Sequence, residues 1–181
     1  GDDSLDLLNR LTTNKLEELP DGLGKSTVIT NGDGRVIDFV QLGALDGHFW
    51  CLTSPGYATA VIDWLDLYTF AEDISVTDCS SSTFQLTLAG PLAGELVGGA
   101  TFPEGPLAEA VTRTTIGMHS VIVWRRYAGG AFGYEIIGDV NALQGIHQFL
   151  LDGGAQSISQ ATWESYRIGN GMPRMDSEFG L

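Results

Sequence analysis

Asn31-Gly32-Asp33-Gly34-Arg35-Val36-Ile37-Asp38-Phe39 leads from a turn sequence into an apolar run. The β-branched residues Thr27-Val28-Ile29-Thr30 come directly before it, and the apolar run continues to residue 42. Because Gly and Asn adopt positive φ at low cost, Asn-Gly-Asp-Gly favours a tight turn between antiparallel strands. The stretch therefore predicts a β-hairpin.

Apolar periodicity on either side of the hairpin predicts an α+β fold. Leu5, Leu8 and Leu11 share one face of a helix over 4–11. The order of the elements favours antiparallel sheets with packed helices, partly of the split βαβ (ferredoxin-like) type. Further helices are predicted at 57–69, 91–97, 141–151 and 158–168, the last capped by Ser157 or Ser159, and strands at 27–30, 35–42, 48–53, 74–78, 83–88, 120–127 and 134–137.

Charge and hydropathy exclude several classes of function. The 181 residues carry a formal net charge of -14, with 9 Lys and Arg against 23 Asp and Glu. A nucleic-acid surface needs a basic stripe, and anionic lipid attracts basic segments, so neither partner is expected. The sequence has no apolar run long enough for a membrane span and does not open with a signal peptide. We expect a cytoplasmic protein with reduced thiols.

Two groups of residues that suggest chemistry lack the spacing it needs. Gly24-Lys25-Ser26-Thr27 resembles the end of a P-loop, but the glycine required five residues earlier is Leu19. A P-loop also leads into a helix, whereas this stretch leads into a predicted strand. The histidines (His48, His119 and His147) are far apart and lack metal-ligand spacing, so no metal site is predicted.

The cysteines do not form a motif. Cys51 and Cys79 lack the Cys-x-x-Cys spacing of zinc and redox sites. Cys51 lies in a strand-like run, which predicts a small core residue.

Five blocks of sequence, in the same order, resemble one protein family. They are similar to blocks of the glycine-cleavage aminomethyltransferases (T-proteins), whose superfamily includes the YgfZ-type folate-binding proteins linked to iron–sulfur cluster maintenance. Residues 7–14 resemble "FLxxLxTND", 31–39 "NxxGGIIDD", 89–93 "xGPxA", 125–135 "RTGYTGExGFE" and 167–173 "RxExGxP".

The resemblance implies a fold and its extent. It implies a folate-binding-type domain over residues 1–181, built from two closely packed subdomains. The family's N-terminal strands and C-terminal barrel would be absent from this chain.

The hairpin is where the chain departs from the enzymes of the family. In aminomethyltransferases the second aspartate of "IIDD" is the essential acid, and this position is Phe39 here. The first aspartate corresponds to Asp38. Because neighbours in a strand point to opposite faces, Asp38 would replace the lost acid only after a register slip or a bulge. YgfZ-type proteins also lack that acid, so the departure favours them.

The resemblance also implies a set of ligand-binding residues. Glu135 matches the family glutamate that bridges the pterin ring of tetrahydrofolate, where a carboxylate accepts two parallel hydrogen bonds. Tyr127 matches a tyrosine that lines the pocket. Arg167 matches an arginine near the ligand and could instead form a structural ion pair. Phe39 and Trp50 are candidates for packing on the pterin, with core packing the simpler role for Trp50.

Three functions follow from these observations. The first is a folate-binding protein of YgfZ type, without aminomethyl transfer and linked to iron–sulfur cluster maintenance. The second is an aminomethyltransferase, or a related one-carbon folate enzyme. The third is an interaction or scaffold domain that has lost the ligand. A protein partner or a second copy of the chain would cover exposed edges.

Overall fold

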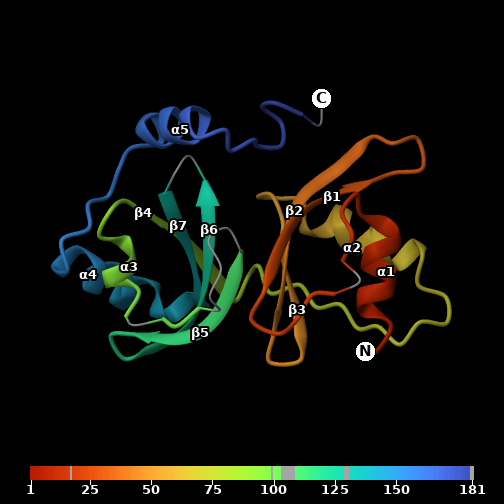
Figure 1. The fold of residues 1–181 in the computed structure, drawn as a ribbon, viewed down its shortest axis with the longest axis horizontal. Helices are drawn as coiled ribbons and strands as arrows, with labels where there is room; N and C mark the ends of the chain where they lie inside the picture. Colours follow the sequence, from red (N-terminus) through yellow and green to blue (C-terminus); the bar gives the residue numbers. More distant parts are fainter. Residues whose placement is uncertain (17, 99, 103–108, 129–130, 180–181) are drawn as a thin grey trace. The chain divides into compact units, whose positions relative to one another are not determined.

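The chain forms two compact units, one of residues 1–78 with 173–181 and one of residues 79–172 (Figure 1). This computed structural model describes all residues except 17, 99, 103–108, 129–130 and 180–181, and only the backbone of 127–128 and 131–132. Each unit has its own antiparallel sheet and its own apolar core. The predicted α+β class is confirmed.

The first unit is a three-stranded meander packed against helices. Its strands β1 (Gly24–Thr30), β2 (Val36–Leu45) and β3 (His48–Leu52) pair in that order. Helices α1 (Ser4–Leu11) and α2 (Ala58–Leu67) bury leucine and valine side chains against β1 and β2. The core consists of Leu7, Leu8, Leu16, Ile29, Val40, Leu42, Val61 and Leu65.

The predicted hairpin is confirmed between β1 and β2. Asn31 closes the turn, because its side-chain Oδ1 accepts hydrogen bonds from the amides of Asp33 at 3.0 Å and Arg35 at 2.9 Å. Gly34 has a φ of 76°, which a residue with a Cβ rarely adopts. The pairing register shifts after Ile29, so that β2 contains a bulge at the start of the hairpin.

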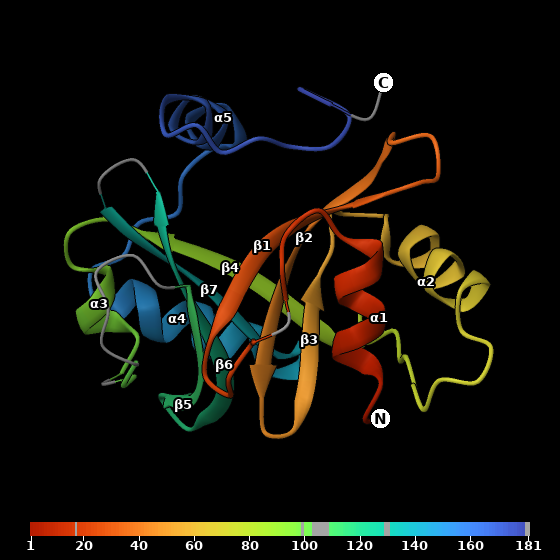
Figure 2. The same cartoon turned by 45° about the vertical axis from the view of Figure 1, so that its right-hand side comes forward.

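The second unit is a four-stranded antiparallel sheet, with the helical segments 93–96 and 140–152 on one face (Figure 2). The strand order is β4 (Thr83–Ala89), β7 (Ala131–Asp139), β6 (His119–Ala128) and β5 (Ala110–Ile116). The core on the helix-covered face joins these strands to α3 (Ala93–Leu96), η1 (Val140–Ala142) and α4 (Leu143–Asp152). α5 (Gln160–Gly169) follows, and the Ser159 hydroxyl caps it by accepting from the amide of Thr162 at 3.2 Å.

Three predictions differ from the observed fold. Residues 74–78 do not form a strand; Ile74 packs against the first core, and an alternating pattern does not distinguish a docked extended segment from a paired strand. Strand β5 is not predicted, because its Thr-rich sequence follows a Gly- and Pro-rich stretch. Cys51 is exposed, because it lies on the edge strand β3.

The longest helices that the structure describes are short. α2, α4 and α5 have 10 residues each. None of the described helices combines the length and the apolar character needed to cross a membrane.

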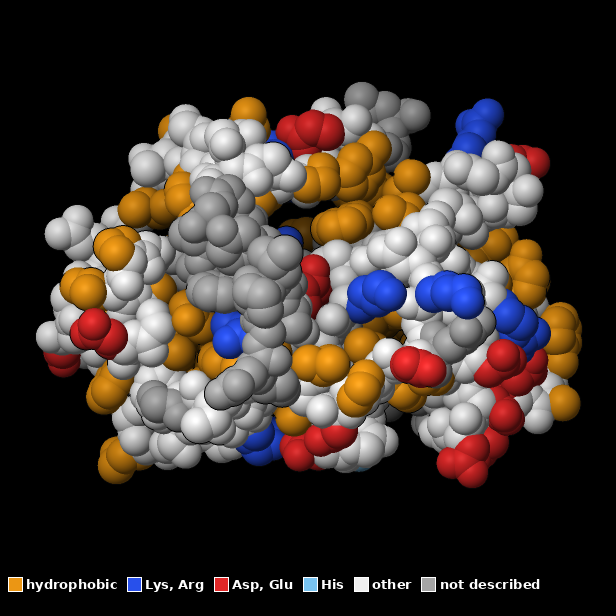
Figure 3. All heavy atoms as spheres, in the orientation of Figure 1, with side chains coloured by type: hydrophobic (Ala, Val, Ile, Leu, Met, Phe, Trp, Pro, Cys, Tyr) orange, Lys and Arg blue, Asp and Glu red, His pale blue; other side chains and the backbone are white. Residues whose placement is uncertain are grey.

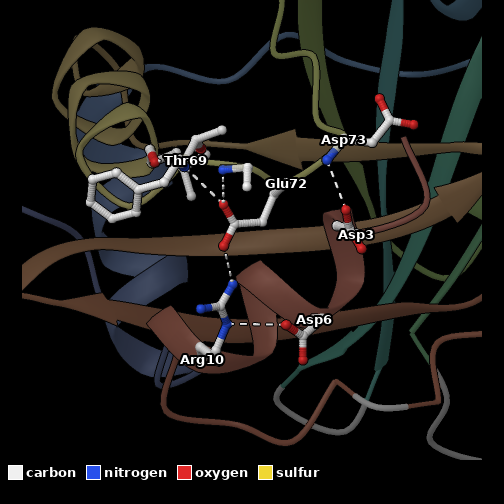
Figure 4. A network of polar contacts seen from close by, with 9 residues as sticks. Asp3, Asp6, Arg10, Thr69, Glu72 and Asp73 are labelled. Atoms are coloured by element: carbon white, nitrogen blue, oxygen red, sulfur yellow. Dashed lines mark hydrogen bonds and ion pairs between the residues drawn. The ribbon is translucent and has the colours of Figure 1, made fainter.

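A polar network joins α1 to the segment after α2. Acidic side chains gather on the surface over α1 (Figure 3). Figure 4 shows the hydrogen bonds and ion pairs that some of them form. The carboxylate of Glu72 accepts from Nη2 of Arg10 at 2.8 Å and from the amides of Phe70 at 2.8 Å and Ala71 at 3.0 Å. These hydrogen bonds lower the pKa of Glu72 to about 2, and the one from Arg10 has the largest effect.

We predict that Glu72→Gln makes the melting temperature less dependent on pH in acid. The folded-state pKa lies below the ordinary value of 4.5, so the ionised carboxylate stabilises the fold above that pH and loses this effect as the pH falls toward 2. Thermal melts between pH 6 and pH 2 measure the change. Glu95→Gln, at an exposed position of α3, is the control. Equal slopes for wild type and Glu72→Gln would contradict the assignment.

Candidate functional site

Glu135 lies in the middle of the second sheet, on the face opposite α3 and α4. It pairs with Thr87 of β4 on one side and with Trp124 of β6 on the other. Directly paired residues of an antiparallel sheet point to the same face. Their neighbours Tyr134 and Ile136 point to the other face, into the core shared with the helices. The strand register therefore places Glu135 among side chains from both neighbouring strands.

The carboxylate of Glu135 is buried and held by three side chains. Only 4% of the residue is exposed. Its Oε2 accepts from Nε2 of Gln85 at 3.0 Å and from Oγ1 of Thr87 at 2.8 Å. Its Oε1 lies 3.6 Å from Nη1 of Arg126 on β6, an ion pair. The buried acid thus keeps polar partners, which offset the loss of water.

Burial raises the pKa of Glu135 above its ordinary value. Hydrogen bonds from Gln85 and Thr87 and the charge of Arg126 act in the opposite direction, because they stabilise the ionised form. The desolvation effect is the larger one. A carboxylate with a raised pKa at the wall of a cavity is a typical mark of a functional site.

A small cavity borders this carboxylate. Arg126 and Glu135 supply its charged groups, and Tyr166 of α5 and Met172 form part of its wall. Its volume is about 10 Å³, which is roughly the room that one water molecule needs. Any organic ligand that reaches Glu135 through this cavity requires a movement of the wall.

Arg167 is part of the support of that wall. It is 5% exposed, and its Nε donates to Oε2 of Glu164 at 2.8 Å. Its Nη1 donates to the carbonyl oxygen of Met172 at 3.1 Å. The structure therefore places the guanidinium in an ion pair within α5 and against the backbone of a cavity residue.

Asp38 and Phe39 occupy opposite faces of β2 in the first unit. Asp38 is 0% exposed, and its two oxygens accept from the amides of Phe39 at 2.8 Å and Ser54 at 2.9 Å. Burial raises its pKa. Phe39 is half-buried and meets Phe179 edge to face, with 6.3 Å between the ring centres. The carboxylate of Asp38 thus ties β2 to the segment that follows β3.

The bulge in β2 does not exchange the faces of these two residues. The register shift precedes Asp38, which pairs with Ile29. From there the alternation is regular, so Asp38 shares the face of the core residue Val40. Phe39 keeps the other face.

The remaining predicted residues are placed as follows. Tyr127 lies in β6 opposite Phe132, and its side chain is outside the described residues. Trp50 is half-buried on β3. Glu135 and Arg167 belong to the second unit, whereas Phe39 and Trp50 belong to the first. Among the described residues no group of three or more His, Cys, Asp or Glu is placed to bind a metal.

Several site residues are missing from the sequence-based prediction. Gln85 and Thr87 alternate on β4, a pattern that predicts a plain solvent-facing side of a strand. Arg126 lies within a family-like block but has no role assigned by it. Tyr166 lies on a helix far along the chain. Gln85 and Thr87 reach Glu135 only through the pairing of β4 with β7, which brings together residues 50 and 48 positions apart in the chain. A local sequence pattern does not predict that pairing.

Comparisons with known proteins give a consistent family. The family model described as "GCVT N-terminal domain" matches residues 1–180. An aminomethyltransferase from Geobacillus sp. is 30% identical over 98 residues, which is 54% of this chain and 27% of that protein. An aminomethyltransferase from Prochlorococcus marinus is 24% identical over 189 residues, 96% of this chain and 50% of that protein.

A different enzyme is also similar over part of the chain. The alpha subunit of a sarcosine oxidase from Corynebacterium sp. is 34% identical over 103 residues, 54% of this chain and 11% of that protein. The matched region spans at most half the length of these three relatives.

We predict that Asp38→Ala destabilises the fold by about 1–3 kcal/mol. Two backbone amides lose their acceptor, and this loss outweighs the gain from no longer burying a carboxylate. Urea unfolding at pH 7 measures the difference. Asp33→Ala, on the exposed turn of the same hairpin, is the matched control and should change stability by less than about 0.5 kcal/mol. An Asp38→Ala variant as stable as Asp33→Ala would show that this carboxylate contributes nothing to the fold.

Proposed function

Because the chain belongs to the family of GCVT N-terminal domains, we propose that it is a folate-binding module of YgfZ type. It binds tetrahydrofolate and does not transfer an aminomethyl group. A link to iron–sulfur cluster maintenance forms part of this proposal. The observation that carries it is the buried carboxylate of Glu135 beside Arg126 and the cavity.

Glu135 is suited to a ring that offers N–H groups. A hydrogen bond from a neutral donor to an ionised carboxylate is stronger than one between two neutral groups, and burial makes it stronger still. The amino-pyrimidine edge of a pterin supplies such donors. The ring enters after Tyr166 or Met172 has moved, since the cavity of about 10 Å³ does not hold it. Arg126, at the same wall, offers donors to a ring carbonyl oxygen.

Two features of the first unit support binding without transfer. The position that matches the essential acid is Phe39, which cannot exchange a proton. The neighbouring Asp38 uses one oxygen for each of two backbone amides and shares its face with Val40. An aminomethyltransferase needs an ionisable group at the reacting amine, and neither residue provides one.

The alternative is an aminomethyltransferase, or a related one-carbon folate enzyme. It is favoured by the two aminomethyltransferases that the chain resembles. An acid other than Asp38 would then have to come from elsewhere in the protein. The scaffold function is favoured by the small size of the cavity at Glu135. Binding of tetrahydrofolate without turnover separates the proposal from both alternatives.

We predict that the wild-type chain binds tetrahydrofolate and that Glu135→Gln weakens binding about 10- to 100-fold, which is the worth of one hydrogen bond to a charged group. Isothermal titration calorimetry under anaerobic conditions measures both affinities. Glu95→Gln is the matched control, an exposed glutamate of the same unit, and should bind like wild type.

Two results would reject this proposal. The first is the absence of binding heat for wild type together with an unchanged melting temperature at high ligand concentration. The second is a one-carbon transfer product when the chain is incubated with tetrahydrofolate and an aminomethyl donor, which would favour the enzyme.

A further inference from the structure

Two polar side chains of the edge strand β4 converge on one oxygen of Glu135. Gln85 and Thr87 both lie at exposed positions, two residues apart. Such residues on an edge strand ordinarily point into water and rotate freely. Here both donate to Oε2, at 3.0 Å and 2.8 Å. Ordering two exposed side chains costs conformational entropy, so their convergence on one buried atom needs a compensating interaction.

Gln85 and Thr87 together occupy one of the two oxygens of the Glu135 carboxylate. An ionised carboxylate has about four lone-pair positions, two on each oxygen. Gln85 and Thr87 occupy those of Oε2. Oε1 lies toward Arg126, whose Nη1 is 3.6 Å away, beyond ordinary hydrogen-bond length. A further N–H donor that reaches Glu135 therefore meets Oε1.

Neutral donors also preserve the charge of the carboxylate. Among the described residues, the polar groups at Glu135 are Gln85 and Thr87 from β4, Arg126 from β6 and, in the wall of the same cavity, Tyr166 from α5. Gln85 and Thr87 add no charge of their own, so the cation in this group is Arg126, whose ion pair with Oε1 is long at 3.6 Å. Both hydrogen bonds stabilise the ionised form and thereby oppose the effect of burial on its pKa.

We propose that Gln85 and Thr87 are positioning residues that fix the Glu135 carboxylate by Oε2, so that Oε1 is presented to the ligand. The inference rests on the proposed function for the identity of that ligand. The positioning itself is a property of this chain and is measurable without ligand.

The first experiment follows the carboxylate directly. Chains labelled with ¹³C at the glutamate carboxyl carbon are titrated by NMR, and Glu135→Gln assigns the resonance. We expect the titration midpoint of Glu135 to rise in Thr87→Val and in Gln85→Leu. Thr87→Ser keeps the hydroxyl and should restore the wild-type midpoint. Thr115→Val makes the same change on the opposite edge strand, β5, and should leave the midpoint unchanged.

The second experiment measures tetrahydrofolate affinity against pH. We expect Thr87→Val to raise Kd about three- to tenfold, which corresponds to the net worth of roughly one side-chain hydrogen bond, with a larger loss at low pH than at high pH. The sign follows from the midpoint: with a higher pKa, less of the variant carries the carboxylate as the pH falls. A uniform loss at every pH would indicate a structural role only.

The outcomes separate the inference from the proposed function. An unchanged midpoint in both Thr87→Val and Gln85→Leu overturns the positioning role, whatever the ligand does. A raised midpoint in a chain that binds no tetrahydrofolate supports the positioning role and rejects the proposed function. A raised midpoint with a matching shift of the pH dependence of binding supports both.

Discussion

A negative charge buried in an antiparallel sheet constrains the residues on every strand next to it. Glu135 is almost completely removed from water, and an isolated carboxylate in that position would be protonated or would destabilise the fold. The sheet meets this constraint with Thr87 and Gln85 from one neighbouring strand and Arg126 from the other. The order β4-β7-β6 thus brings polar partners to this buried acid from both sides.

The first unit contains a second buried acid, with a different solution. Asp38 is tied to two backbone amides, so its partners belong to the main chain and do not depend on the side chains of neighbouring residues. Both of its oxygens are engaged within the fold. At Glu135, by contrast, the donors gather on one oxygen. One buried acid is thus satisfied by the main chain, and the other by side chains, with Arg126 as an ion-pair partner of its second oxygen.

The sequence predicts local features better than distant pairings. The hairpin and the α5 cap follow from Asn31, Gly34 and Ser159, whose effects reach only a few residues. The identity of the buried acid at Glu135 came from resemblance, and its partners could not be predicted, because pairing of β4 with β7 depends on the packing of the whole sheet. The unpaired segment at 74–78 shows the same limit, because alternation of side chains does not specify a partner strand.

The contacts of Arg167 link the cavity wall beside Glu135 to the end of α5. One guanidinium holds both Glu164 within α5 and the carbonyl oxygen of Met172, and the amide of Met172 donates back to the carbonyl of Arg167 at 2.8 Å. Arg167 therefore connects the end of α5 to Met172 in the cavity wall. Displacing Met172 from the wall would therefore also break its contacts with Arg167, so the position of this wall residue is coupled to the end of α5.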